Sequence, residues 1–481
     1  MPVGSARRAR VTQAAFALHA YKPDEGTDAA MELYNEDMSI WHVSSARVAY
    51  FVSCVRRYEV SNGQKALGEK YLQFALTRVG SLLFQMALCL RFKGIAAYSA
   101  AAPSGITVTS NGVLDAAANG AQVQPYLCDY AGPAAVLCSE MHVGSHKMLE
   151  ISNAAQVIIE ELHGSAGHNG KKMSGKHAEN PVAPWDMAKF EQLIIVPMQF
   201  FFCKSTGSAL PMSAIGFHSA ECRFSLAELD AILVKPDVTL AQAGGTGSTA
   251  LYGTASAQFQ VYLRDETAAW DTAPTTLATS ANILADVYLL ATVVSLPIDE
   301  ADSILAQAIT QNITKYETVS ATQYMSAPPT ADYEFSQKIS VKRPIDAIYV
   351  VPRQRGAFFA NMFAAAPSFA PTRATPLLTN MAVEVDGHKV FDCPYDENQL
   401  NYLWNCGQNT DLPIMVAAWS QDTSLDIAVG SLYANSALEV LCKPTIAKEA
   451  WTATVKNVDL DFVVQYKEPM TIAFGMLELT H

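Results

Sequence analysis

The residues that could carry out chemistry are concentrated in one stretch, because five of the ten histidines fall between positions 142 and 177. Cys138, His142 and His146 are spaced four residues apart, and on a helix they would share one face and could bind a soft metal ion such as zinc. Gly144 and the Ala-Gly-Pro before Cys138 argue against a helix there. The other three histidines lie in a glycine-rich segment with no HExxH or CxxC spacing: His163, His168 and His177. We therefore predict a solvated loop and no metal site.

Motifs for phosphate binding and nucleophilic catalysis are incomplete in this chain. Gly245-Thr246-Gly247 imitates a dinucleotide-binding turn, but a strand pattern follows where the phosphate site needs a helix. Gly170-Lys171-Lys172 lacks the upstream glycine and the Ser or Thr of a phosphate-binding loop. No G-x-S-x-G sequence is present, and His218 lies in a strand pattern that favours a structural role. We predict that the protein is not an enzyme and has no catalytic, cofactor-binding or metal-binding residues.

Two strands joined by a polar turn are predicted between residues 191 and 226. The run 193–203 is apolar, β-branched and aromatic, which is typical of a strand buried on both faces. Residues 204–207 supply turn chemistry. The second strand alternates between polar and apolar residues, so one face meets a core and the other meets water. Its apolar set is Ala220, Cys222, Phe224 and Leu226.

The same stretch resembles the major capsid proteins of nucleocytoplasmic large DNA viruses, of the iridovirus and chlorovirus type. In that family a proline-led aromatic strand, P-x-x-F-W-F, precedes a small-residue turn and then A-L-P-L-I-A-L-x-Y-H-x-V. The matching positions are filled without a gap by Pro197, Phe200, Phe202, Gly207, Ala209, Leu210, Pro211, Met212, Ala214, Ile215, Phe217, His218 and Ala220. The resemblance covers nearly the whole chain and is strongest at 193–224. It implies two jelly rolls per chain and three chains per pseudo-hexagonal capsomer of an icosahedral shell.

The composition limits the classes of partner. The chain has 481 residues, 50% of them hydrophobic and only 16% charged. This low charge indicates either that much of the surface lies against other protein or that the core is large relative to the surface. A net charge of -13 argues against a broad nucleic-acid surface. The one basic cluster, Arg7, Arg8 and Arg10, is either a solvated tail or an anchor to an anionic inner layer.

Cysteine usage and hydropathy indicate where the protein is made. The nine cysteines have no paired spacing, and most lie in apolar strand patterns, as buried free thiols do in a reducing compartment. We recognise no secretory signal, and no apolar run approaches the roughly 18 to 20 residues of a membrane span. We therefore expect a soluble protein made in the cytosol. Its one sequon, Asn312-Ile313-Thr314, lies beside the apolar stripe of a predicted helix and should carry no conventional glycan.

The rest of the chain predicts many short strands, few helices and long surface loops at 99–125 and 163–180. One helix is predicted at 297–316, with Pro297 in its first turn, acidic residues at its start and an apolar stripe. We predict an all-β fold of two consecutive eight-stranded jelly-roll β-sandwiches with a few short helices. Residues 1–228 would form the N-terminal jelly roll with an arm at 1–35, residues 229–240 a linker, and residues 241–481 the C-terminal jelly roll.

Together the residues and the resemblance favour a structural major capsid protein that forms homotrimers in the virion. The partners implied by the resemblance are neighbouring capsomers, minor capsid and penton proteins, and an underlying internal membrane, after synthesis in the host cytoplasm. The alternative is a carbohydrate-binding or carbohydrate-active β-sandwich, which needs paired carboxylates and a groove lined by Trp and Tyr. The six tryptophans are dispersed and would line such a groove only through folding: Trp41, Trp185, Trp270, Trp404, Trp419 and Trp451.

Overall fold

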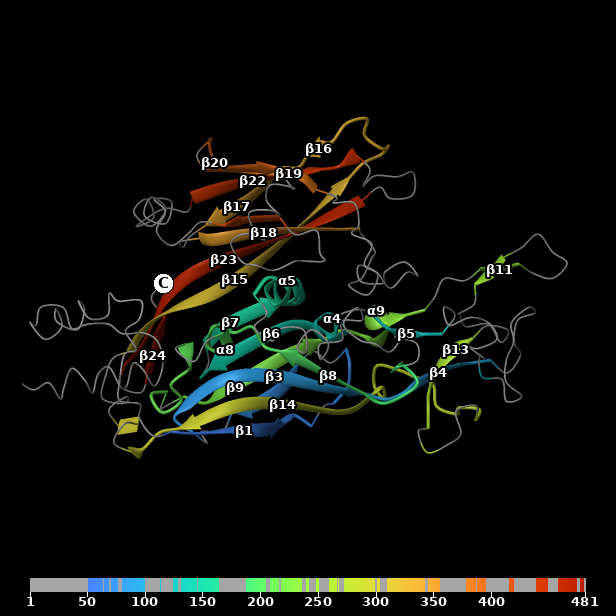
Figure 1. Cartoon of the computed structure of the whole chain (residues 1–481), viewed down its shortest axis with the longest axis horizontal. Helices are drawn as coiled ribbons and strands as arrows, with labels where there is room; N and C mark the ends of the chain where they lie inside the picture. The colour runs from blue at the N-terminus through green and yellow to red at the C-terminus, as the bar shows by residue number, and fades with distance from the viewer. Residues whose placement is uncertain are drawn as a thin grey trace, which may run out of the picture.

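The computed structural model describes residues from Phe51 to Leu479 with gaps, of which the longest span 100–112, 114–123, 164–186, 355–377, 395–414 and 419–437. Within the described residues the chain forms four large antiparallel sheets, which we name A to D, and Figure 1 shows sheets C and D above sheets A and B.

The first jelly roll is built from sheets A and B. Sheet A has the order β1 (Val52–Glu59), β14 (Leu284–Ser295), β3 (Leu82–Phe92) and β8 (Gln192–Pro197). Sheet B has the order β2 (Leu72–Leu76), β9 (Ala220–Leu226), β6 (Val136–Val143) and β7 (His146–Ser152). Counted one to eight along the chain, these strands give the orders 1-8-3-6 and 2-7-4-5. That arrangement is the eight-stranded jelly roll.

The second jelly roll repeats the same order in sheets C and D. Sheet C contains β15 (Ile309–Tyr324), β23 (Asn457–Ala473), β18 (Ile345–Gln354) and β21 (Met415–Ala418), and β24 (Met476–Leu479) pairs with β23. In sheet D, β16 (Tyr333–Glu334) and β17 (Gln337–Val341) both pair with β22 (Leu438–Ile446), followed by β19 (Leu378–Val385) and β20 (His388–Pro394). The predicted fold class, all-β with two jelly rolls, is confirmed.

The longest connections of the first jelly roll leave it at one end. They join β3 to β6 and β9 to β14, and the additional strands they carry lie on the right of Figure 1. These strands are β4 (Ile95–Tyr98), β5 (Tyr126–Leu127), β10 (Leu233–Val234), β11 (Thr239–Ala241), β12 (Ser248–Ala250) and β13 (Gln260–Leu263). Short helices in the described part of the chain include α4 (Ala131–Ala135), α5 (Asn153–His163), α8 (Phe201–Lys204) and α9 (Leu229–Ile232).

Each jelly roll has a core between its two sheets. In the first, Phe74 and Phe224 meet edge to face with ring centroids 5.6 Å apart. In the second, Phe335 stacks on Phe462 at 6.2 Å. Sheet C is buried on both faces, because alternate residues of β23 join different cores: Phe462 lies in the second and its neighbour Val463 in the first. The two jelly rolls are therefore packed directly against each other.

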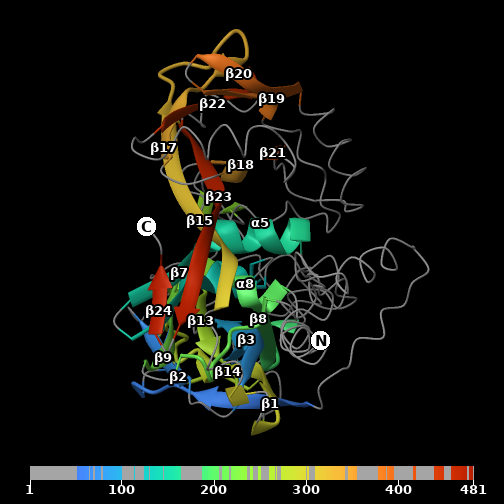
Figure 2. The same cartoon turned by 90° about the vertical axis from the view of Figure 1, so that its left-hand side faces the viewer.

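Helix α5 fills the junction between the jelly rolls (Figure 2). Its first turn is capped by Ser152 Oγ, which accepts the Ala155 N–H at 3.3 Å. The same oxygen lies 2.6 Å from Thr318 Oγ1 on β15 of the second jelly roll. On the helix itself, Gln156 Nε2 donates to the carbonyl of Pro197 at the end of β8 (2.5 Å). One short helix thus ties sheets A, B and C together.

The predicted boundary between the halves is wrong, because the linker predicted at 229–240 is not where the sheets divide. Strand β14 lies in residues 241–481, yet it pairs with β1 and β3 along its length and completes sheet A. Strand β13 likewise pairs with β4. The first jelly roll needs an eighth strand between its first and third, and β14 supplies it. We propose that the boundary between the two units falls between Ser295 and Ile309.

The predicted helix at 297–316 is also wrong from Ile309 onward. Residues Ile298, Ala301 and Asp302 are helical, and the Ala301 N–H donates to the Pro297 carbonyl at 3.0 Å. From Ile309 the chain is instead β15, which pairs residue for residue with β23. The sequence there, ITQNITKYETV, is dense in β-branched residues, which favour strands. The backbone pairing of β15 with β23 of the second jelly roll therefore favours a strand, although the apolar stripe in the sequence favours a helix.

The strand predicted at 193–203 is shorter than expected and is buried on one face only. Strand β8 ends at Pro197, and residues Phe201–Lys204 form α8. Ile194 and Val196 enter the first core, while Leu193 is exposed. Phe200 and Phe202 are fully buried and stack with centroids 5.5 Å apart, so the aromatic residues close the end of the core without extending the sheet. The alternation predicted for 219–226 is confirmed in β9.

Candidate functional site

The outer face of sheet A is the first candidate surface for assembly. On β14, Val287 and Leu289 point into the first core, so Asp286, Tyr288 and Leu290 point outward. Register places Arg57 of β1 beside Leu290, and Cys89 of β3 beside Tyr288. This face is therefore built from all the strands of the sheet and alternates between charged and apolar side chains.

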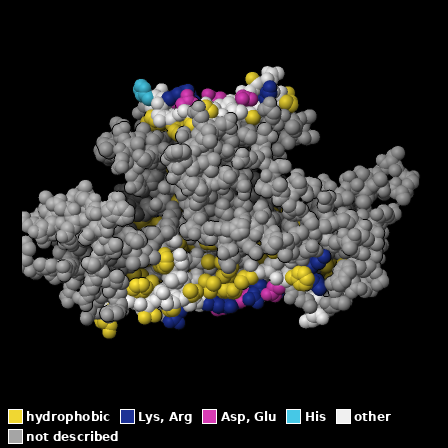
Figure 3. Space-filling model, viewed as in Figure 1, with side chains coloured by type: hydrophobic (Ala, Val, Ile, Leu, Met, Phe, Trp, Pro, Cys, Tyr) yellow, Lys and Arg dark blue, Asp and Glu magenta, His cyan; other side chains and the backbone are white. Residues whose placement is uncertain are grey.

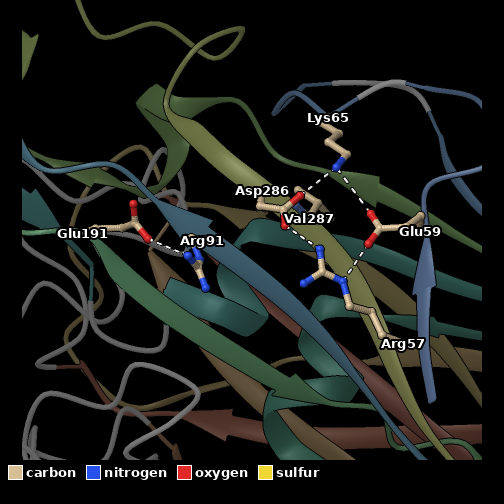
Figure 4. A network of polar contacts seen from close by, with 7 residues as sticks. All are labelled: Arg57, Glu59, Lys65, Arg91, Glu191, Asp286 and Val287. Atoms are coloured by element: carbon tan, nitrogen blue, oxygen red, sulfur yellow. Dashed lines mark hydrogen bonds and ion pairs between the residues drawn. The ribbon is translucent and has the colours of Figure 1, made fainter.

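Charged side chains on this face neutralise one another (Figure 4). Arg57 donates to Glu59 at 2.6 Å and to Asp286 at 2.7 Å, and its guanidinium lies 3.9 Å from the Tyr288 ring centroid. Lys65 closes the loop, with its ammonium 2.7 Å from Asp286 and 3.4 Å from Glu59. A separate pair joins Arg91 and Glu191 at 3.1 Å. These three cations and three anions leave the face without net charge.

The ion pairs change the pKa values of the groups in them. Hydrogen bonding to Arg57 lowers the pKa of Glu59 below its ordinary value. Partial burial opposes ionisation of Asp286, but its hydrogen bonds to Lys65 and Arg57 outweigh that cost, so its pKa is also lowered. Both carboxylates are therefore ionised at neutral pH and hold β1 to β14.

Apolar side chains fill the rest of the face and both its edges. Ala87, Ile195 and Pro197 are partly exposed on β3 and β8. Val55 is well exposed on β1, on the same side as Arg57, and Leu193 is exposed on β8. Figure 3 shows apolar side chains along the lower part of the molecule, where Figure 1 has β14 and β1, with charged groups beside them. Such a face suits contact with protein more than with water.

The outer face of sheet B is different in character. Register places Gln73, Arg223, Glu140 and Glu150 in one row across its strands. The ion pairs Arg223–Glu221 and Lys147–Glu150 and the hydrogen bond from Gln73 to Glu221 (2.5 Å) run over this face. Polar groups thus replace the partly exposed alanine, isoleucine and proline of sheet A. This face is suited to water.

The residues considered as metal ligands lie in the β6–β7 hairpin, not on a helix. Cys138 and His142 are on β6, while His146 begins β7 opposite Val143, so the three do not converge. A different group does: one ligand atom from each of Cys138, Glu140 and Glu150 lies within 4.8 Å of the others. The pairing of β6 with β7 brings Glu150 next to Cys138 and Glu140. The spacing of these residues along the sequence does not reveal this proximity.

The chemistry of this group does not favour a metal ion. The Lys147 ammonium contacts Glu150 and lies 3.6 Å from Glu140, so it already supplies a cation to both carboxylates. Burial, together with Glu150 and Glu140, raises the pKa of the Cys138 thiol to about 12, so it is not a thiolate at neutral pH. His142 Nε2 is 2.8 Å from Glu140 Oε2. The absence of a metal site stays a prediction.

The remaining sequence candidates are spread over the molecule. His218 lies beside Gly144, at the turn of the β6–β7 hairpin, and His163 is the last residue of α5. The sequon falls in β15, where Ile313 is fully buried. Several candidates lie outside the described residues: Arg7, Arg8, Arg10, His168, His177, Gly170-Lys171-Lys172, Gly245-Thr246-Gly247 and all six tryptophans.

Eight cysteines fall within the described part of the chain, and all are free thiols. Burial raises the pKa of Cys89 to about 11 and the pKa values of Cys203 and Cys442 to about 12. These thiols are therefore protonated and unreactive at neutral pH. None of the helices among the described residues has the length and apolar character needed to cross a bilayer.

Comparison with known proteins finds similarity to viral major capsid proteins. Residues 141–263 match the family described as "Major capsid protein N-terminus". The major capsid protein of Pyramimonas orientalis virus is 28% identical over 142 residues, which cover 29% of this chain and 34% of that relative. That match therefore spans about a third of the curated relative.

Solved structures extend the likeness over the whole chain. The quasi-atomic structure of the PBCV-1 virus capsid covers 92% of this chain and is itself covered completely, with a TM-score of 0.61 and 14% identity. This chain has the fold of a viral major capsid protein. The Faustovirus major capsid protein matches over 98% of both chains, with a TM-score of 0.57 and 11% identity.

The major capsid protein of mavirus matches over 96% of both chains at a TM-score of 0.52 and 9% identity. At these identities the structures establish the major capsid fold itself. Together with the family match, they confirm the resemblance seen in the sequence to the double jelly-roll major capsid proteins of large DNA viruses. The likeness is to structural proteins of virus shells and not to enzymes, as predicted.

Proposed function

We propose that this chain is the major capsid protein of a large icosahedral double-stranded DNA virus and that it forms trimeric, pseudo-hexagonal capsomers. The observation that carries the proposal is the repeated jelly roll, with strand orders 1-8-3-6 and 2-7-4-5 in both halves. Two similar sandwiches per chain give a trimer six lobes of nearly equal shape. A block of that shape can occupy a six-fold environment in a shell.

The rigid junction between the jelly rolls supports this role. Sheet C is buried on both faces, and α5 joins three sheets. A capsomer must hold its lobes at fixed angles so that neighbouring capsomers meet in register. A shared core provides that rigidity where a flexible linker would not.

The other expected partners belong to the same proposal. Contacts with neighbouring capsomers, minor capsid proteins and penton proteins would accompany assembly in the virion, after synthesis in the host cytoplasm. An internal membrane would lie beneath the shell. The net charge of -13 favours repulsion between free trimers before assembly and gives no support to sequence-specific nucleic-acid binding.

Negative-stain imaging of the purified protein tests the proposal. The expected particles are three-fold symmetric with a hexagonal outline. Small single-lobed particles, together with binding to a glycan array, would instead support the carbohydrate-binding alternative.

A further inference from the structure

The second jelly roll repeats one hairpin of the first in length, in register and in one ion pair. Strands β6 and β19 have eight residues each, and β7 and β20 have seven each, with the sequences HKMLEIS and HKVFDCP. In both hairpins a bulge follows the sixth residue of the first strand. A lysine also pairs with the acidic residue three positions later in both, as Lys147–Glu150 and Lys389–Asp392. The β19–β20 hairpin is therefore the counterpart of the β6–β7 hairpin.

Sheet A is likewise the counterpart of sheet C, and strand register aligns their residues. In both sheets the last residue of the sixth strand lies opposite an alanine of the third strand, which is Ala87 in sheet A and Ala347 in sheet C. From these alanines the register continues without a bulge across the eighth strand to the first. The residues aligned in this way on the two first strands are Arg57 with Tyr316 and Glu59 with Thr318.

Within one chain the β6–β7 hairpin docks on the outer face of sheet C. The hydroxyl of Ser152, the last residue of β7, lies 2.6 Å from the hydroxyl of Thr318 on β15. On the same face, Tyr349 and Val351 of β18 are buried and belong to the first core. The residue of sheet A aligned with Val351 is Arg91, whose side chain is 42% exposed. Among the described residues, the outer face of sheet A thus lacks the cover that sheet C has.

We propose that the β19–β20 hairpin of one copy docks on the outer face of sheet A of the next copy, as the β6–β7 hairpin docks on sheet C within a chain. This inference rests on the proposed function, because it names the surface by which copies join in the trimer. Each jelly roll then presents one hairpin and receives another on its 1-8-3-6 sheet. Such a head-to-tail contact closes into a ring when its rotation allows. Three copies would supply all six lobes, joined alternately within and between chains.

The alignment names the residues that meet between copies. Pro394, the exposed last residue of β20, takes the place of Ser152, and Glu59 of β1 takes the place of Thr318. Proline has no hydroxyl, so packing would replace the hydroxyl contact, and Val55, which is 65% exposed on the same face of β1, is available for it. Figures 1 and 2 both show β20 at the top of the molecule and β1 at the bottom, with sheets B and C between them. One chain therefore cannot bring Pro394 to its own Glu59.

Paired cysteines test the contact, with the contact inside the chain as the reference. Ser152→Cys combined with Thr318→Cys should form a disulfide within one chain, because the hydroxyls that the thiols replace are already in contact. Pro394→Cys combined with Glu59→Cys should form a disulfide between copies. On a non-reducing gel, mild oxidation should leave the first variant at the mobility of a single chain. It should convert most of the second into covalent dimers and trimers.

Matched variants show whether the bond is specific. Pro394→Cys alone and Glu59→Cys alone retain the native cysteines and should give no more covalent dimer than the wild-type protein. Pro394→Cys combined with Leu137→Cys, at an exposed position on β6 of sheet B, should also give no more. Cross-linking of this last pair as efficient as that of Pro394→Cys with Glu59→Cys would overturn the proposed interface.

A measurement on the wild-type trimer decides the question if the double variant does not fold. In trimers mixed from light and isotope-labelled copies, a short amine cross-linker should join Lys389 of β20 in one copy to Lys65 in another, since the Lys65 ammonium is 3.4 Å from Glu59. A trimer with neither this link nor the disulfide between Pro394→Cys and Glu59→Cys would overturn the interface and leave the proposed function standing. A monomeric wild-type protein would contradict the proposed function itself.

Discussion

The two outer faces of the first jelly roll have the same strand geometry but different side chains. Sheet A presents Leu290, Ile195 and Pro197 among ion pairs that are closed on themselves, and its edges expose valine, leucine and phenylalanine. Sheet B presents a row of glutamine, arginine and glutamates. Both sheets bury their inner faces in one core, so the core explains neither outer face. The difference indicates that sheet A meets protein and sheet B meets water.

The largest expected effect comes from the core that both faces share. Phe224 is fully buried in sheet B and packs edge to face on Phe74. Phe224→Ala should lower the free energy of unfolding by about 3–5 kcal/mol, because it removes apolar contacts and leaves a cavity. Chemical denaturation measures this loss. A loss below about 1 kcal/mol would show that the core is not the common support of the two faces.

The next largest effect distinguishes the outer face of sheet A from that of sheet B. Val55→Asp places a charge at the exposed β1 edge of sheet A, and Leu137→Asp places the same charge at an exposed position of sheet B. The first should weaken the trimer about 10–100-fold, or about 1.4–2.8 kcal/mol, since the carboxylate would be buried unpaired in the contact. The second should leave the trimer unchanged. Sedimentation at several concentrations measures both. Equal effects would remove the distinction between the faces.

These predictions also show which parts of the structure the sequence could reveal. The alternation of Ala220, Cys222, Phe224 and Leu226 predicts β9 correctly. Local periodicity works here because burial of one face imposes a period of two.

Which strands pair with each other could not be predicted in the same way. β14 falls in the second half as predicted from the sequence because it follows the linker predicted at 229–240, and nothing in its period names β1 and β3 as its neighbours. The same limit explains the missed strand from Ile309 and the missed group of Cys138 with Glu150, since pairing across the chain creates both. Outer faces were not predicted at all, because an exposed valine is informative only once its sheet is known.

Acid should weaken sheet A through its ion pairs. The pKa values of Glu59 and Asp286 are lowered in the folded chain, so their contribution is present above the ordinary carboxyl pKa of about 4 and is lost as pH falls through the lowered values. We therefore expect the thermal unfolding midpoint to decrease as the pH is lowered below about 4. The Glu59→Gln/Asp286→Asn double variant should show a flatter pH profile. An unchanged profile would mean that the network does not stabilise β1.

The smallest effect is expected from metal removal on sheet B. Lys147 already neutralises Glu140 and Glu150, and the Cys138 thiol is protonated, so a strong chelator should leave the unfolding midpoint unchanged. Lys147→Met should instead lower stability, because it leaves Glu140, whose side chain is 12% exposed, and Glu150 close together without their cation. Stoichiometric zinc in the purified protein, lost on substitution of Cys138, would contradict this account.

The central claim is that this chain assembles as a trimer. Light scattering coupled to size-exclusion chromatography at micromolar concentration measures the mass of the particle directly. The account predicts a stable particle of three times 52.0 kDa. A well-behaved monomer or dimer would contradict it.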